Sequence, residues 1–220
     1  RQDRIGFVGA NGCGKTTMMK MIMGIEEPDE GQVILGPTVK LGYFSQENES
    51  LDPSQRVIDY IRDTAEYVKT EDGMVSASVM LERFLFDATL QYSLIGKLSG
   101  GEKRRLYLLK VLMEAPNILI LDEPTSGLDP VSREDLLDVF LSLKDDGKTI
   151  LFSTPVTSDL DKCADDITYI RNGKIFASEP TDTFKEKYKL AFVKKDAFTD
   201  DIAACSHGIR RHKDGLSVLI

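Results

Sequence analysis

The chain has 220 residues, of which 41% are hydrophobic and 29% are charged, and its formal net charge is −8 at pH 7. This length suffices for one large domain with a hydrophobic core, and the acidic balance argues against a strong electrostatic footprint for nucleic acid or anionic lipid. The three cysteines are scattered and odd in number, which argues against a disulfide framework and fits a reducing cytoplasm. We see no apolar stretch long enough to span a bilayer, so a membrane role would require a partner chain.

The first predicted strand, over 4–8, leads into a glycine-rich turn and then into a helix that runs to about Gly24. The turn reads Gly9-Ala-Asn-Gly-Cys-Gly-Lys-Thr and has the phosphate-binding pattern G-x-x-x-x-G-K-[ST]. In this context backbone N–H groups point at a phosphate, Lys15 brings a positive charge to the β- and γ-phosphates, and the Thr16 hydroxyl is placed to ligate Mg²⁺. The predicted ATP-binding residues are Gly9, Asn11, Gly12, Cys13, Gly14, Lys15, Thr16 and Thr17.

The next elements are two short strands, predicted over 32–35 and 39–44 around a Gly-Pro turn. After them, apolar residues recur at helical spacing, which predicts a helical subdomain over about 50–97. The polar stretch 69–73 is predicted to be the loop between its helices.

The segment Leu98-Ser-Gly-Gly-Glu begins a helix predicted over about 100–114. Ser99 and Glu102 have the spacing of a helix capping box, which is a purely structural interpretation. A helix N-terminus with two glycines is also an anion site, because its first N–H groups are free and the dipole is positive there. Both interpretations can hold together.

A run of four apolar residues, 118–121, predicts a strand buried on both faces, and two carboxylates follow it. Ligands bind at this edge of open α/β sheets, so we expect Asp122 to hold Mg²⁺ and Glu123 to orient or deprotonate a water molecule. A helix over about 130–145 is expected to begin after an N-cap at Asp129. A central strand over 149–153, a hairpin of 167–171 with 174–177, and a helix over 181–188 complete the predicted elements.

The phosphate loop, L-S-G-G-E, strand-Asp-Glu-Pro and Ser126-Gly-Leu-Asp129, in this order, resemble the nucleotide-binding domain of ABC-type ATPases. The resemblance implies an α/β P-loop fold, with a mostly parallel central sheet, flanking helices and an inserted helical subdomain. It also implies antiparallel strands before the phosphate loop, which are missing from the eight residues that precede Gly9. The expected domains are 1–180, the nucleotide-binding domain, and 181–220, a small and incomplete C-terminal extension.

The resemblance implies hydrolysis of Mg-ATP at the interface of a homodimer or heterodimer. Glu123 and Gln46 would be catalytic, and Thr16, Gln46 and Asp122 would hold the metal. The residues expected to act in trans, on the nucleotide bound by the partner protomer, are Ser99, Gly100, Gly101 and Asp129.

Two departures from the family pattern predict weaker activity. Pro155 stands where the family carries a histidine that contacts the γ-phosphate, and proline offers neither a side-chain donor nor a backbone N–H. We therefore expect ATP binding to survive better than hydrolysis. The segment before Gly9 also lacks the aromatic residue that stacks on adenine in the family, since Phe7 lies in the core strand.

The biological role has three candidates. Residues 1 to about 125 resemble the soluble F-type ABC proteins that act on ribosomes, whereas the segments after Asp129 resemble the ATP-binding subunit of a bacterial exporter. Our leading hypothesis is the exporter subunit, in the cytoplasm and peripheral at the inner face of the membrane through a membrane-spanning partner. The ribosome-bound ATPase and a nucleotide-binding switch with little hydrolysis are the alternatives. The pair His207 and His212 is predicted to belong to a solvated basic turn.

Overall fold

The computed structural model of the chain describes residues 3–45, 51–70, 73–145, 147–194, 197–206, 208–212 and 214–219. The chain divides into two compact units, Arg1–Ser178 and Glu179–Ile220. The assignment of these parts as a nucleotide-binding domain and an extension stays a prediction.

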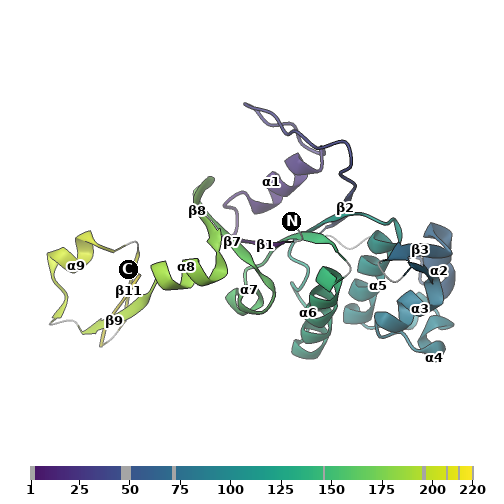
Figure 1. Cartoon of the computed structure of the whole chain (residues 1–220). Coiled ribbons are helices and arrows are strands. Elements are labelled where there is room, and N and C mark those ends of the chain that lie inside the picture. The colour runs from purple at the N-terminus through teal and green to yellow at the C-terminus, as the bar shows by residue number, and fades with distance from the viewer. Residues whose placement is uncertain are drawn as a thin grey trace. The chain divides into compact units, whose positions relative to one another are not determined.

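The first unit is built on a six-stranded sheet with the order β2-β5-β6-β1-β7-β8 (Figure 1). The first five strands in this order pair in parallel. The apolar run predicted to be a doubly buried strand is β5, and Leu119, Ile120 and Leu121 are fully buried. The predicted α/β fold with a mostly parallel sheet is therefore confirmed. The bounds are β1 Arg4–Val8, β2 Leu41–Phe44, β5 Ile118–Leu121, β6 Thr149–Ser153, β7 Asp166–Arg171 and β8 Lys174–Pro180.

Helices lie on both faces of this sheet. Figure 1 shows α1 (Lys15–Ile22) on one face and α5 (Gly100–Met113), α6 (Pro130–Asp145) and α7 (Thr157–Cys163) on the other. Under α1, Met19 packs in a cluster with Phe7, Ile120 and Ile170. This packing fixes the start of α1 at the end of β1, which is where the glycine-rich turn lies.

The predicted helical subdomain contains a hairpin as well as helices. Its helical elements are α2 (Val57–Thr64), α3 (Ala77–Arg83), α4 (Ala88–Gln91) and the 3₁₀ turn η1 (Ile95–Lys97). The prediction that 69–73 is a simple interhelical loop is wrong, because β3 (Tyr67–Thr70) and β4 (Gly73–Ser76) pair antiparallel there. Val68 and Val75 are buried opposite each other, so the apolar alternation of a half-buried strand prevails over the polar composition.

The predicted strand over 32–35 is also wrong. These residues have no regular structure, and Val33, Ile34 and Leu35 are 42%, 78% and 47% exposed. The second predicted strand forms only over Leu41–Phe44, and it pairs with β5 rather than with 32–35. A strand exists only where a partner satisfies its backbone, and the described residues provide none for 32–35.

The second unit contains a three-stranded antiparallel sheet of order β10-β11-β9. Leu216 and Val218 of β11 are buried in it. The predicted basic turn falls partly outside the described residues, since His207 is among those not described. His212 directly follows the strand β10, and its backbone N–H donates to Gly215 O at 2.8 Å. The elements are α8 Thr181–Lys187, β9 Leu190–Lys194, α9 Asp200–Ala204, β10 Gly208–Arg211 and β11 Gly215–Leu219.

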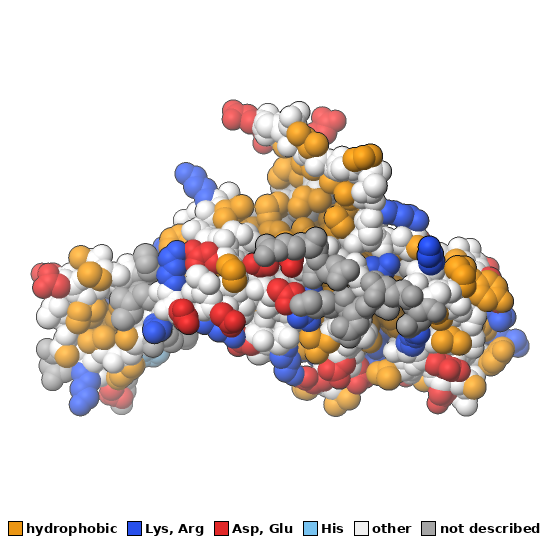
Figure 2. Space-filling view, viewed as in Figure 1, with side chains coloured by type: hydrophobic (Ala, Val, Ile, Leu, Met, Phe, Trp, Pro, Cys, Tyr) orange, Lys and Arg blue, Asp and Glu red, His pale blue; other side chains and the backbone are white. Residues whose placement is uncertain are grey.

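The described surface carries charges of both signs. On the face shown in Figure 2, acidic and basic side chains are interspersed with apolar ones. Among the described helices, none is both long and apolar enough to cross a membrane.

Candidate functional site

The glycine-rich turn links the end of β1 to the start of α1. Gly14 occupies the N-cap position with a φ of 102°, a conformation that favours glycine, and no side chain caps the helix there. The turn is closed by Cys13 N–H, which donates to Ala10 O at 3.1 Å. Lys15 is buried, and its Nζ donates to Gly9 O at 2.9 Å. The first helical N–H groups are thereby presented at a tight turn with a lysine beside them, which suits an anion.

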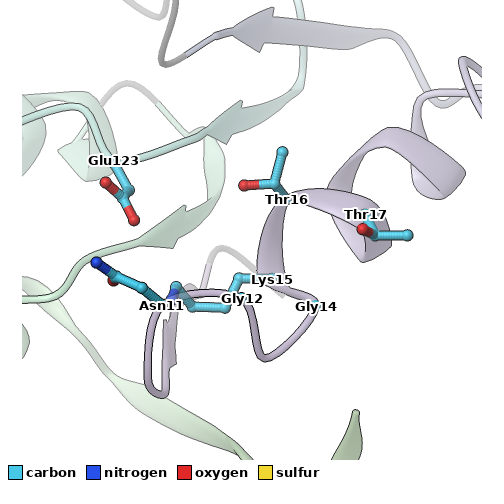
Figure 3. Close-up of a pocket in the computed structure, with 7 residues that line it drawn as sticks. All are labelled: Asn11, Gly12, Gly14, Lys15, Thr16, Thr17 and Glu123. Atoms are coloured by element: carbon cyan, nitrogen blue, oxygen red, sulfur yellow. The ribbon is translucent and has the colours of Figure 1, made fainter.

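A cavity of about 310 Å³ lies against this turn. In Figure 3, Glu123 lies across it from the turn, the Thr16 hydroxyl is directed toward Glu123, and Thr17 points away. The structure thus brings together seven of the residues singled out in the sequence: Asn11, Gly12, Gly14, Lys15, Thr16, Thr17 and Glu123.

Ser153, at the end of β6, connects the two carboxylate residues. Its hydroxyl donates to Asp122 Oδ1 at 2.7 Å and accepts from Glu123 N–H at 2.9 Å. Glu123 has a φ of 45°, a left-handed conformation that a residue with a side chain adopts at a cost. Ser153 therefore helps to hold the backbone that carries the Glu123 carboxylate, and it is a site residue that the sequence motifs did not reveal.

The donor set at Asp122 fits a divalent cation. Asp122 is 1% exposed, and among the described residues its Oδ2 has no hydrogen-bond partner. Thr16 provides a hydroxyl oxygen on the cavity wall. Mg²⁺ prefers oxygen ligands and is commonly held by one or two carboxylates together with substrate phosphates and water. Gln46, the third metal ligand expected from the sequence, lies outside the described residues.

Arg104 of α5 contacts the turn that follows β5 and carries Glu123. Its guanidinium donates to Glu123 O at 3.2 Å, to Pro124 O at 3.4 Å and to Ser45 O at 3.3 Å. Burial lowers the pKa of Arg104 from its ordinary value, and the nearby Tyr107 and Asp122 oppose this shift. The L-S-G-G-E string does not indicate that Arg104 contacts the turn of Glu123. The available signal is an arginine on the buried face of a helix, because arginine is rarely buried without a partner.

The L-S-G-G-E segment forms the complete capping box predicted from its spacing. The Ser99 hydroxyl accepts from Glu102 N–H at 3.2 Å, and Glu102 Oε2 accepts from Ser99 N–H at 2.7 Å. Ser99 and Gly100 are exposed, whereas Gly101 is buried so tightly that an added Cβ would lie 2.2 Å from Ser132 Oγ. Within the capping box the Ser99 hydroxyl acts as a hydrogen-bond acceptor. Its O–H can therefore donate to a further group.

Asp129 lies at the start of α6, apart from the cavity. Its Oδ1 accepts from the N–H groups of Val131 and Ser132, both at 3.1 Å, so the predicted N-cap is confirmed. The Ser132 hydroxyl and the Ser132 amide lower the pKa of Asp129, against a smaller effect of burial. Its side chain is exposed, like Ser99 and Gly100, so within one chain these residues do not join the cavity.

Pro155 lies two residues beyond the end of β6 and is exposed, while Ser153 and Thr154 before it are buried. The position is therefore close in sequence to Ser153, which the end of β6 supplies to the site.

Comparison with known proteins gives a consistent result. The family model described as "ABC transporter" matches residues 1–126. A protein of Bacillus subtilis named as an uncharacterized ABC transporter ATP-binding protein, YfmR, is 52% identical over 142 residues, which are 63% of this chain and 23% of that protein. The energy-dependent translational throttle protein EttA of Escherichia coli K12 is 35% identical over 194 residues, which are 88% of this chain and 34% of that protein. The aligned part of the chain thus spans 23% and 34% of the length of these two relatives.

Two solved structures share the fold. One is an ATP-binding subunit of an ABC transporter, with a TM-score of 0.65, 24% identity and coverage of 84% of this chain and 82% of that one. The other is a dimeric ATP-binding cassette in a post-hydrolysis state with ADP and phosphate, with a TM-score of 0.63 and 20% identity, covering 81% and 85%. At these identities the likeness establishes the fold alone.

Proposed function

Because the chain belongs to the ABC transporter family of ATP-binding domains, we propose that it binds Mg-ATP in the cavity between the glycine-rich turn and Glu123 and hydrolyses it to ADP and phosphate. The observation that carries the proposal is the convergence on one cavity of Lys15, the Thr16 hydroxyl and Glu123, with the buried Asp122 beside it. These are the groups that phosphoryl transfer to water requires.

In this proposal the turn and the first N–H groups of α1 bind the β- and γ-phosphates, and Lys15 adds its charge. Thr16 and Asp122 hold Mg²⁺, which, when bound, neutralises charge on the phosphate oxygens. Glu123 orients the attacking water and accepts its proton. Ser153 fixes the relative position of the two carboxylates through its hydrogen bonds to both residues.

A second protomer completes the site in the proposal. Ser99 and Gly100 are exposed at the N-terminus of α5, and the Ser99 hydroxyl has a proton to donate. These features suit contact with the γ-phosphate held by a partner, and the exposed Asp129 is open to the same interface. Hydrolysis is proposed to be slow, because Pro155 supplies no donor where the family has a histidine.

Two biological roles follow from the relatives and the sequence. The exporter subunit remains the role suggested by the segments after Asp129. A role in translation is favoured by the name of the E. coli relative, an energy-dependent translational throttle protein, which aligns with 88% of this chain. Cosedimentation of the ATP-bound Glu123→Gln variant with bacterial ribosomes or with inverted membrane vesicles distinguishes the two roles. The variant should pellet with ribosomes if it acts in translation and with vesicles if it is an exporter subunit. A chain that does neither and hardly turns over would be the nucleotide switch.

Calorimetric titration with Mg-ATP tests the binding step. The Lys15→Ala variant should lose affinity at least tenfold, because the loop loses its charge. The matched control is Lys20→Ala on the same helix, whose Nζ pairs with Glu26 at 3.5 Å on the surface, and its affinity should match the wild type. A wild-type chain that binds no Mg-ATP, or equal affinities in the two variants, would contradict the proposal.

A further inference from the structure

Arg104 is a buried cation that donates hydrogen bonds to several backbone carbonyls. It is 5% exposed, it lies on α5, and its guanidinium reaches the carbonyl oxygens of Ser45, Glu123 and Pro124. A buried charge is tolerated only when hydrogen bonds satisfy it, and a planar fork with five N–H donors can serve several carbonyls at once.

One arm of this cation holds the Glu123 turn. The carbonyl oxygen of Glu123 accepts from Arg104 Nη2 at 3.2 Å and from Ser126 N–H at 3.0 Å. The backbone N–H of Glu123 donates to Ser153 Oγ at 2.9 Å. The left-handed backbone of Glu123 is therefore fastened on both sides. The direction of the Glu123 side chain depends on that backbone, so these contacts set where the carboxylate points.

The other arm reaches the end of β2. The guanidinium carbon lies 4.4 Å from the centroid of the Phe44 ring, and Ser45 O accepts from Nη1 at 3.3 Å. Phe44 is fully buried and also packs on Tyr107 of α5, with ring centroids 4.8 Å apart. Asp122 N–H donates to Phe44 O at 2.8 Å, which ties the same strand end to the carboxylate edge.

We propose that Arg104 is a positioning residue for hydrolysis, which couples the first turns of α5 to the Glu123 backbone and to the end of β2. Arg104 lies five positions after Ser99, on the helix whose exposed N-terminus meets the partner's nucleotide in the proposed dimer. A shift of α5 on engagement of that nucleotide would move the carbonyls that Arg104 holds, and with them Glu123. This coupling rests on the proposed function.

The adjacent Arg105 provides a matched comparison. It is equally buried, at 6% exposed, but its Nη1 pairs with Asp135 of α6 at 2.7 Å and its guanidinium lies over Phe86, 5.9 Å from the ring centroid. Lysine can replace Arg105 in a single ion pair. Lysine cannot replace Arg104 in the same way. Its single ammonium group on a flexible chain does not reproduce the planar guanidinium, which donates to three carbonyls at once.

The test compares Arg104→Lys, Arg104→Met and Arg105→Lys with the wild type. We expect the turnover rate at saturating Mg-ATP to fall at least tenfold in both Arg104 variants, with the Kd for Mg-ATP changed less than threefold, since misplacement of a reacting group lowers the rate more than binding. Arg105→Lys should retain wild-type turnover. Equal loss of turnover and affinity in the Arg104 variants, or full turnover in Arg104→Lys, would overturn the proposal.

Amide hydrogen exchange gives a second readout that does not depend on catalysis. In Arg104→Met the Ser126 amide should exchange at least tenfold faster, because the carbonyl of Glu123 that it pairs with is less restrained, while Arg105→Lys should leave it unchanged. Unchanged exchange in both variants would reject the positioning role. A wild-type chain without turnover would contradict the proposed hydrolysis, and the exchange measurement would still decide the role of Arg104.

Discussion

Glu123 illustrates how single residues shape this site. A left-handed φ at a residue with a side chain costs about 1–3 kcal/mol, and such strain persists where neighbouring groups hold it in place. Here the N–H of Glu123 donates to the Ser153 hydroxyl, and the carbonyl of Glu123 accepts from Arg104. Both holding residues are far from Glu123 in the sequence, so neither could be inferred from the motif that contains Glu123.

We propose that Pro155 lowers the rate of hydrolysis. It follows β6 one residue after the buried Thr154, and it offers no donor to the reacting phosphate. We expect Pro155→His to raise the turnover rate, because one preorganised donor to a transition state is worth roughly 10²–10³ in rate. The measurement is steady-state phosphate release at saturating Mg-ATP.

The control for this substitution is Pro155→Ala, which restores the backbone N–H without adding a side-chain donor. Its turnover should remain close to that of the parent chain. If histidine and alanine at 155 give the same rate as proline, the missing side chain does not limit hydrolysis.

At the scale of elements, a buried carboxylate joins α7 to the segments around it. Asp159 is 1% exposed, and its Oδ2 accepts from Thr125 Oγ1 at 2.9 Å and from Thr154 Oγ1 at 3.0 Å. Its Oδ1 accepts from Arg133 Nε of α6 at 2.9 Å. The turn after Glu123, the segment after β6 and the start of α6 therefore depend on one side chain.

A second ion pair joins the same two helices at the surface, which permits a direct comparison. Asp159→Ala should lower the free energy of unfolding by about 3–5 kcal/mol, because Arg133 loses its buried partner. Lys162→Ala removes only the contact of Lys162 with Glu134, whose side chains are 47% and 56% exposed, and should change stability little. Urea unfolding followed by circular dichroism measures both, and equal stabilities of the two variants would show that the Asp159 cluster is not structural.

The elements with a strong local signal could be predicted from the sequence, and those that depend on distant partners could not. The turn before Lys15, the capped helix α5 and the strand β5 each follow from local residues. The stretch 32–35 has the apolar content of a strand but finds no partner strand in the described part of the chain. The hairpin β3–β4 could not be predicted, because the helical spacing on both sides of it favours two helices joined by a loop.

At the scale of the whole molecule, the two compact units differ in how far they could be predicted. The first carries the ordered motifs, and its sheet places the ends of β1, β5 and β6 side by side, which is why motifs more than a hundred residues apart meet at one cavity. The second unit has no such motif. The sequence predicts its helix over 181–188 but none of its strands. They are short and pair antiparallel, so their register is set by each other rather than by a local pattern.

Turnover of Mg-ATP by the wild type beside Glu123→Gln is the measurement that tests the central claim most directly. The substitution keeps the size and hydrogen-bonding capacity of the side chain and removes its ability to accept the proton of water. We predict slow but measurable phosphate release by the wild type, none by the variant, and unchanged Mg-ATP affinity in both. Equal phosphate release by the two proteins, or none by the wild type at saturating Mg-ATP, would contradict the claim that this cavity hydrolyses ATP through Glu123.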